Sequence, residues 1–172
     1  TYAAYYLGDI NDGEMLNLSW MQYMDFYDAV SNVDGVDYED YETLWFWFDV
    51  NGKLVRAEDE EVVTKTINGV KYAFDQNGVM LSSWINTLND ATSSTASDGT
   101  LTDPETDIKY FSDSNDGHLQ KSTWIWAVPS EEIDAEDYDD ETYRWFYAGS
   151  TGTIYKNDIK TINNKKYAFD QN

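Results

Sequence analysis

Residues Thr66 to Met80 read TINGVKYAFDQNGVM, and this stretch decides the fold. Asn68-Gly69 lies between β-prone residues. An Asn-Gly pair in that setting is the strongest short-range signal for a hairpin, because both central residues of a type I′ turn need a positive φ. The pattern predicts strands near 62–67 and 70–74. Tyr72 and Phe74 are two residues apart, so they should share one face of the second strand.

The same stretch returns near the end of the chain. Residues Thr161 to Asn172 read TINNKKYAFDQN, which matches Thr66 to Asn77 at 10 of 12 positions. Two further pairs of segments recur with it: Tyr6–Trp20 with Tyr110–Trp124, and Trp45–Gly52 with Trp145–Gly152. We therefore expect one repeat domain over residues 1–172, a fragment of a longer protein, with one copy of the unit at about 1–88 and a second at about 108–172.

Each copy contains a smaller repeat, and six such pieces follow one another along the chain. A piece has a strand that often begins with Trp, a connection, an aromatic strand, and a turn that ends in Gly and an apolar residue. Isolated hairpins are marginal in water, whereas stacked hairpins bury their aromatic faces. We expect an all-β fold, a β-solenoid of stacked β-hairpins. Long, mostly acidic loops should project from it at 28–43, 89–107 and 129–142.

The composition excludes several classes of function. The 172 residues carry 33 Asp and Glu against 11 Lys and Arg, a formal net charge of −22. So acidic a chain lacks the groups that contact nucleic-acid phosphates or anionic lipid, so we expect no nucleic-acid partner. No segment approaches the ~20 apolar residues of a membrane span, so we expect no membrane insertion. There is no cysteine and no Gly-rich phosphate loop, so no cofactor is expected. The charge suits an extracellular protein with a neutral or cationic ligand, or simply a surface that keeps an aromatic-rich chain soluble.

Three stretches share an aromatic strand followed by a Gly-containing turn: Lys71–Trp84 (KYAFDQNGVMLSSW), Trp45–Leu54 (WFWFDVNGKL) and Trp145–Ile154 (WFYAGSTGTI). They resemble the choline-binding and glucan-binding type of cell-wall-binding repeats of Gram-positive surface proteins, whose unit runs roughly GWxxxxGxWYYxxxxGxM. They are also similar to the C-terminal repeats of large clostridial toxins. Six pieces in one register make the resemblance fairly specific, and it covers nearly all of the chain outside the long loops.

The resemblance implies ligand sites between consecutive hairpins. Choline-binding members surround a quaternary ammonium with several ring faces, which attract it by cation–π interaction, whereas glucan-binding members stack aromatics on sugar rings. Transferred position by position, the resemblance implies three sites: Trp20 and Trp45 completed by Phe74, Trp84 and Tyr110 completed by Tyr147, and Trp124 and Trp145 completed by Phe169. Met80 matches the Met that often follows the turn glycine, and it joins the implied ligand-binding residues.

Three features depart from the family pattern. The glycine before the leading Trp is replaced by Ser19, Ser83 and Thr123. The piece that contains Tyr72 has no leading Trp, so Tyr72 has no evident partner for a site. In the fourth piece, Ser112 replaces the last aromatic residue of the aromatic strand. The alternative interpretation assigns every ring to the core, because aromatics carry much of the burial in a small β core.

Nothing in the sequence supports catalysis or a metal site. The single histidine, His118, follows a turn glycine, and no pattern around it points to a catalytic triad. The segments Asn32–Gly35 and Asn115–Gly117 resemble parts of an EF-hand loop. Neither has the pair of terminal carboxylates that such a loop needs.

We therefore expect a non-catalytic module that attaches a secreted protein to a bacterial cell surface. Its partner would be choline-bearing teichoic acid or an α-glucan. A second hypothesis is a structural spacer or adhesion stalk, whose acidic loops bind a protein partner and whose rings are all core. Exposure of the leading Trp side chains between hairpins favours the first hypothesis, and their burial favours the second.

Overall fold

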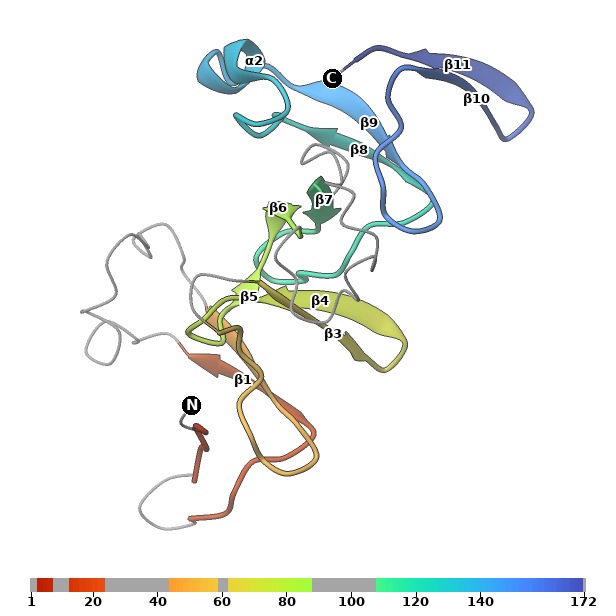
Figure 1. Ribbon diagram of the computed structural model, residues 1–172. Helices are drawn as coiled ribbons and strands as arrows, with labels where there is room; N and C mark the ends of the chain where they lie inside the picture. Colours follow the sequence, from red (N-terminus) through yellow and green to blue (C-terminus); the bar gives the residue numbers. More distant parts are fainter. Residues whose placement is uncertain (1–2, 8–12, 24–43, 59–61, 88–107, 172) are drawn as a thin grey trace, which may run out of the picture. The chain divides into compact units, whose positions relative to one another are not determined.

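The computed structural model describes residues 3–7, 13–23, 44–58, 62–87 and 108–171, which form short antiparallel hairpins and one described helix (Figure 1). The strands are β1 (Ser19–Tyr23), β2 (Leu44–Phe48), β3 (Val63–Ile67), β4 (Val70–Phe74), β5 (Met80–Leu81), β6 (Ser83–Asn86), β7 (Ile108–Phe111), β8 (Thr123–Ala127), β9 (Arg144–Ala148), β10 (Asp158–Ile162) and β11 (Lys165–Phe169). The all-β prediction is confirmed. The predicted loops at 28–43 and 89–107 lie outside the described residues.

The hairpin predicted around Asn68-Gly69 is confirmed in detail. Strands β3 and β4 pair antiparallel with Ile67 opposite Val70, so the turn holds two residues. Asn68 and Gly69 have φ values of 50° and 83°, as a type I′ turn requires. The repeat hairpin β10–β11 turns in the same way on two residues that are both Asn, with φ values of 48° and 64°.

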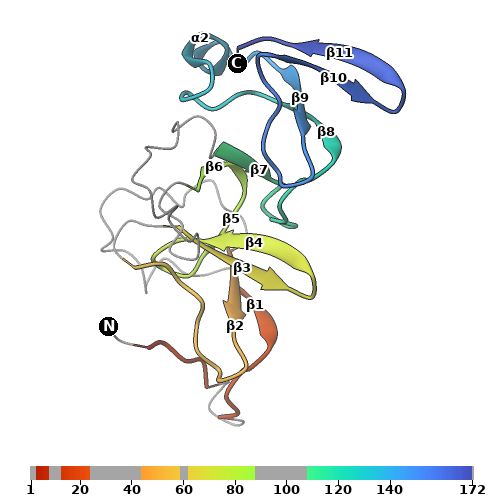
Figure 2. The ribbon, with the colours of Figure 1, turned by 45° about the vertical axis from the view of Figure 1, so that its right-hand side comes forward.

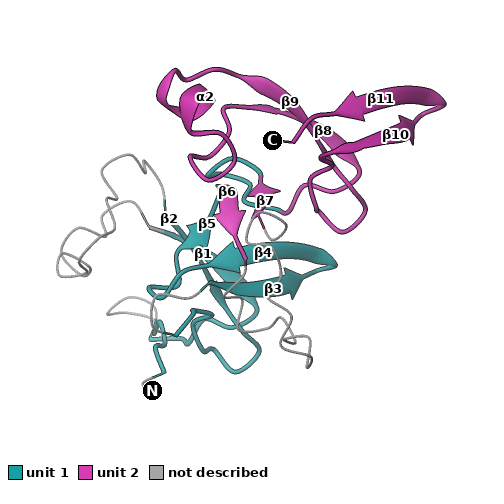
Figure 3. Cartoon of the chain, turned by 45° about the horizontal axis from the view of Figure 1, so that its top comes forward, with its two compact units in different colours: residues 1–83, 89–94, 112–118 teal, residues 84–88, 95–111, 119–172 magenta. Residues whose placement is uncertain are grey.

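Contacts divide the chain into two compact units, drawn in different colours in Figure 3. The first comprises residues 1–83, 89–94 and 112–118, and its sheets are β1–β2 and β3–β4–β5. The second comprises residues 84–88, 95–111 and 119–172, and it contains most of β6 together with β7 to β11. In the second unit, hairpin β8–β9 is followed along the chain by hairpin β10–β11 (Figure 2).

Strand β2 packs on both of its faces, and each face serves a different cluster. In β2, Leu44, Phe46 and Phe48 pack with Val79, whereas Trp47 points the other way and packs with Ile67, Phe74 and Met80. This division follows from the alternation of side chains along a strand. In the second unit, Ile125, Ala127, Phe146 and Ala148 form the corresponding core between β8 and β9.

The turns between hairpins are built alike. The Asp49 carboxylate accepts hydrogen bonds from the backbone N–H groups of Asn51 and Lys53, at 2.8 and 2.9 Å, and the Asp75 carboxylate does the same for Asn77 and Val79. In four of these turns the glycine is covered by an apolar side chain from the preceding turn. The pairs are Met15 on Gly52, Leu54 on Gly78, Met80 on Gly117 and Leu119 on Gly152. The glycine of each of these turns therefore makes room for the apolar residue that follows the glycine of the turn before it.

The predicted loop at 129–142 contains a short helix that the sequence pattern did not predict. Helix α2 (Ala135–Asp139) begins after Asp134, whose carboxylate caps it by accepting from the N–H of Asp137. Asp137 is buried and forms an ion pair with Arg144 at the start of β9. The pair fixes the helix against the strand it precedes. The hydrogen bond that the Arg144 guanidinium donates to the Asp137 carboxylate is the largest cause that raises the pKa of Arg144.

Candidate functional site

The first aromatic site gathers four rings around Trp20 on β1. Trp47 is its cross-strand partner on β2, and Trp45 lies two residues earlier on the same face. Ring centroids lie 6.4 Å from Trp20 for Trp45, 5.2 Å for Trp47, 4.9 Å for Tyr72 and 5.9 Å for Phe74. The planes of Trp20 and Trp45 are perpendicular, at 89°. The structure thus brings together the three predicted residues and adds two that were not predicted.

The last aromatic site repeats this geometry around Trp124 on β8. Centroids lie 6.3 Å from Trp124 for Trp145, 5.1 Å for Tyr147, 4.8 Å for Tyr167 and 6.0 Å for Phe169. Each distance agrees with its counterpart at the first aromatic site to within 0.1 Å, and the two Trp planes again stand perpendicular, at 90°. Two sets of rings so alike show that the repeat preserves a three-dimensional arrangement.

A cavity opens at the last aromatic site. Its volume is about 440 Å³, and its lining residues are Trp124, Trp145 and Tyr167. The plane of Trp124 stands at 90° to that of Trp145 and at 65° to that of Tyr167. Trp145 is 62% exposed. Three ring faces set at large angles around a hollow are the arrangement that suits a compact organic cation.

The middle aromatic site differs from the other two. The rings in contact with Trp84 are those of Tyr110 and Phe146, each at 4.8 Å. The structure places the predicted third member, Tyr147, with Trp124 instead. Phe146 and Tyr147 are neighbours on β9, so they point to opposite faces, and only Phe146 reaches Trp84. Trp84 also donates a hydrogen bond from Nε1 to the backbone oxygen of Val128, at 2.6 Å.

Two walls of the middle aromatic site are not aromatic. Ile108 precedes Tyr110 by two residues, where the other sites have Trp45 and Trp145. Arg144 precedes Phe146 by two residues, where the other sites have tyrosine. Arg144 carries a positive charge, so this position does not offer a ring face to a cation.

Met80 is the remaining predicted ligand residue. It lies in β5, is 5% exposed, and packs in the core with Trp47, Ile67 and Phe74. Its side chain covers Gly117 in the next turn. The structure therefore gives Met80 a packing role beneath the first aromatic site.

The rings that the sequence pattern missed follow a simple rule. Tyr72 and Tyr167 each stand two residues before a predicted member, Phe74 or Phe169, on the same strand face. Trp47 stands two residues after the predicted Trp45 on β2. Spacing by two was the signal that could have found them. The sequence leaves Tyr72 without an evident partner, because its own hairpin lacks a leading Trp. In the structure its partner is Trp20 of the preceding hairpin.

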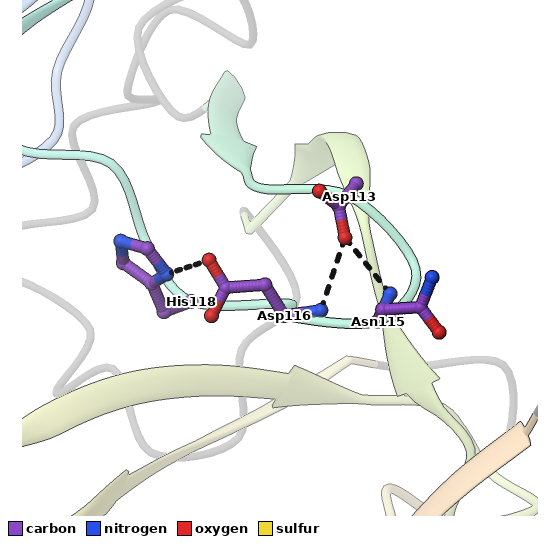
Figure 4. Close-up of polar contacts among 4 residues, drawn as sticks. All are labelled: Asp113, Asn115, Asp116 and His118. Atoms are coloured by element: carbon purple, nitrogen blue, oxygen red, sulfur yellow. Dashed lines mark hydrogen bonds and ion pairs between the residues drawn. The ribbon is translucent and has the colours of Figure 1, made fainter.

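The turn that contains the single histidine lies beside β4 in the first unit (Figure 4). His118 Nδ1 lies 2.6 Å from Asp116 Oδ2, and Asp113 accepts hydrogen bonds from the N–H groups of Asn115 and Asp116. Burial, and then the charge of Asp116, raise the pKa of Tyr72. Here the carboxylates order a turn. Among the described residues, no three acidic or histidine side chains converge as metal ligands would.

Within the same described part of the chain, no helix has the length and apolar character to span a membrane. No family model matches the sequence, and no curated protein matches it. Solved structures do match. Choline-binding protein F from Streptococcus pneumoniae covers 96% of this chain with 39% of its own, at 17% identity and a TM-score of 0.51.

Two further structures extend this comparison. CbpF in complex with ipratropium covers 97% of this chain with 42% of its own, at 17% identity and a TM-score of 0.51. A truncated alternansucrase from Leuconostoc mesenteroides covers 83% with 9% of its own, at 18% identity and a TM-score of 0.46. The chain thus spans about two fifths of the length of choline-binding protein F. At this level of identity the likeness establishes the fold.

Proposed function

We propose that this chain, which shares its fold with choline-binding protein F, is a non-catalytic module that binds choline head groups of a cell-wall polymer. The observation that carries the proposal is the repetition of one ring arrangement at the first and last aromatic sites. A core needs buried rings but does not need Trp145 to stand 62% exposed at the edge of a three-walled hollow. The likeness to a choline-binding protein supports the same ligand class.

The chemistry of the two sites favours a quaternary ammonium. Each ring face contributes about 0.5–2 kcal/mol to the binding of a cation, according to how far the cation is desolvated. Three walls then give a dissociation constant on the order of 1 mM, which corresponds to about 4 kcal/mol. The net charge of −22 raises the local concentration of cations further. An α-glucan is the other member of the ligand class that the repeats suggest.

Attachment by weak sites depends on having more than one. Two choline sites on one chain raise the apparent affinity for a polymer that carries many choline groups, because the second contact forms within the complex. In the proposed arrangement the hairpins stack as a β-solenoid, supported within each unit by the turn glycines and the apolar side chains that cover them. The module would hold a larger secreted protein at a bacterial surface through choline-bearing teichoic acid.

The proposal is tested by titrating the chain with choline chloride and measuring binding by isothermal calorimetry and by Trp fluorescence. Sodium chloride of equal ionic strength is the control. We expect two sites per chain, because the middle aromatic site lacks two of its walls. Trp145→Ala, which removes an exposed ring, should leave one site. Trp45→Ala should remove the other.

Other outcomes of the titration have a definite meaning. Three equivalent sites would show that Ile108 and Arg144 do not disable the middle site. Saturable binding that survives both substitutions would place the ligand elsewhere. No response to choline, with a response to isomaltohexaose, would assign the module to glucans.

The spacer hypothesis has one observation in its favour. The described loop at 131–141 carries exposed carboxylates and an exposed Tyr138, which a basic protein partner could contact. Trp47 and Phe74 are buried, so these rings serve the core in either hypothesis. If the folded chain responds neither to choline nor to isomaltohexaose, that result favours the spacer hypothesis.

A further inference from the structure

A second group of rings stands next to the last aromatic site, on the same face of hairpin β8–β9. Trp126 is the cross-strand partner of Trp145, and Tyr143 directly precedes β9. Trp126 lies 5.0 Å from Trp145 and 5.7 Å from Tyr143. Trp126, Tyr143 and Trp145 are 51%, 54% and 62% exposed. Single exposed apolar residues are ordinary, whereas an exposed Trp126 in contact with two other exposed rings points to a ligand.

The geometry of this group differs from that of the cation sites. Trp126 and Tyr143 are close to parallel, at 27°, and Trp126 is tilted by 42° from Trp145. Parallel rings in direct contact are separated by about 3.5–4 Å, so centroids 5.7 Å apart belong to rings displaced sideways, each with part of its face uncovered. This is a platform rather than a hollow, and it cannot surround a cation.

The other hairpins lack the platform. Gln22 occupies the position of Trp126 in hairpin β1–β2, opposite Trp45, and Asn86 follows Trp84 by the same two residues. The repeat therefore does not need an aromatic here for folding. The extra rings distinguish the last aromatic site from the first.

We infer that Trp126 and Tyr143 form a sugar-stacking platform, on which a pyranose ring of the ligand packs while its cationic group occupies the hollow between Trp124, Trp145 and Tyr167. Only the placement of the cationic group in the hollow rests on the proposed function; the platform itself does not. A pyranose presents a flat C–H face whose burial on an aromatic ring is favourable. Trp145 lines the hollow and contacts Trp126 of the platform, so a sugar and a group linked to it would bind side by side. The first aromatic site, with Gln22, recognises the head group only.

The test compares three probes on the whole chain: choline chloride, a synthetic disaccharide that carries phosphocholine, and isomaltohexaose. To isolate the last site, the comparison uses a Trp45→Ala background. We expect the disaccharide probe to bind about tenfold more tightly than choline, the gain of one good aromatic contact. Trp126→Ala should abolish that gain and leave the affinity for choline within about twofold.

Matched variants separate the platform from a general effect on the fold. Trp126→Gln copies the residue of hairpin β1–β2 and should behave like Trp126→Ala. Gln22→Ala should change no affinity. Because Trp126 is more than half exposed, Trp126→Ala and Trp126→Gln should both fold, and circular dichroism checks this.

The outcomes distinguish this inference from the proposed function. A gain that persists without Trp126 overturns the platform, and so does an equal loss of choline and disaccharide binding, which would make Trp126 a support for the hollow. If no probe with choline binds but isomaltohexaose binds and is lost in Trp126→Ala, the platform stands and the choline proposal fails. If no saccharide probe binds, the platform is overturned.

Discussion

At the scale of single residues, the backbone just ahead of the leading Trp strands is left-handed. Leu18 precedes β1 and Ser122 precedes β8, and their φ values are 43° and 52°. A left-handed conformation costs a residue with a Cβ roughly 1–2 kcal/mol. Ser83, directly before Trp84, also has a positive φ, of 63°, so at the middle aromatic site the left-handed residue stands where the family pattern has glycine. At the other two sites the left-handed residue stands one position earlier than the Ser19 and Thr123 that the pattern indicated.

Replacing these residues by glycine should stabilise the chain. We expect Leu18→Gly and Ser122→Gly each to raise the free energy of unfolding by about 0.5–1 kcal/mol, since relief of strain exceeds the entropy that glycine adds to the unfolded state. Urea denaturation measures the change. Ser150→Gly is the control, because Ser150 is an exposed turn residue without a positive φ, and it should lose stability. Equal effects at Ser122 and Ser150 would refute the assignment.

The turn glycines provide a second prediction at this scale. Gly117 and Gly69 both have positive φ, at 60° and 83°, but only Gly117 is covered, by Met80. A Cβ on Gly69 would meet nothing within 4 Å. Alanine at either position has a similar backbone cost, so the difference isolates the contact. We expect Gly117→Ala to be more destabilising than Gly69→Ala by about 1–3 kcal/mol.

Thermal and urea denaturation of the two variants check this prediction. Gly117→Ala combined with Met80→Ala should recover part of the difference, because the smaller side chain leaves room for the Cβ. Equal destabilisation by both single substitutions would show that Met80 does not set the position of the turn.

At the scale of elements, hairpins β3–β4 and β10–β11 show what local sequence determines. Their nearly identical sequences adopt the same turn, the same pairing and the same placement of Tyr and Phe against a leading Trp. Their burial differs, because Leu81 of β5 pairs with Ala73 on β4. Ala73 is 0% exposed, whereas its counterpart Ala168 on β11 is exposed. Local sequence sets conformation, and the neighbouring strand sets burial.

A matched pair of substitutions tests this distinction. Ala73→Leu should cost about 1–3 kcal/mol, because a larger side chain has no space beside β5. Ala168→Leu should stay within about 0.5 kcal/mol, as exposed substitutions usually do. Melting temperatures of the two variants give the comparison. A large loss at Ala168 would mean that β11 has a partner in solution.

The same contrast explains which parts of the candidate site could be predicted. The turn at Asn68-Gly69 and the shared face of Tyr72 and Phe74 depend on residues close in sequence, so pattern alone found them. Which ring of the following hairpin meets a given Trp depends on how one hairpin sits on the next. Pattern therefore assigned Tyr147 to Trp84, where the structure has Phe146. Helix α2 was missed because its carboxylate-rich sequence has no apolar periodicity.

At the scale of the whole molecule, the charge is the dominant property. A net charge of −22 on 172 residues makes the folded chain repel itself. Raising ionic strength from about 0.01 to 0.15 M shortens the screening length from about 30 to 8 Å. We expect a gain of about 1 kcal/mol in stability, or about 2–4 °C in melting temperature. Calorimetry in sodium chloride measures it, and a fall in melting temperature over this range would contradict it.

The difference in length between the hairpin loops has a consequence for how such a chain can evolve and be engineered. Hairpins β1–β2 and β3–β4 each keep five facing residue pairs, although one tip holds two residues and the other spans positions 24–43. The pairing of the two strands therefore does not depend on the length of the loop that connects them. New segments can therefore be spliced in at a tip while the framework is inherited unchanged. Such a molecule is a ready-made display scaffold, and Asn163-Asn164 is the natural place to graft a foreign peptide.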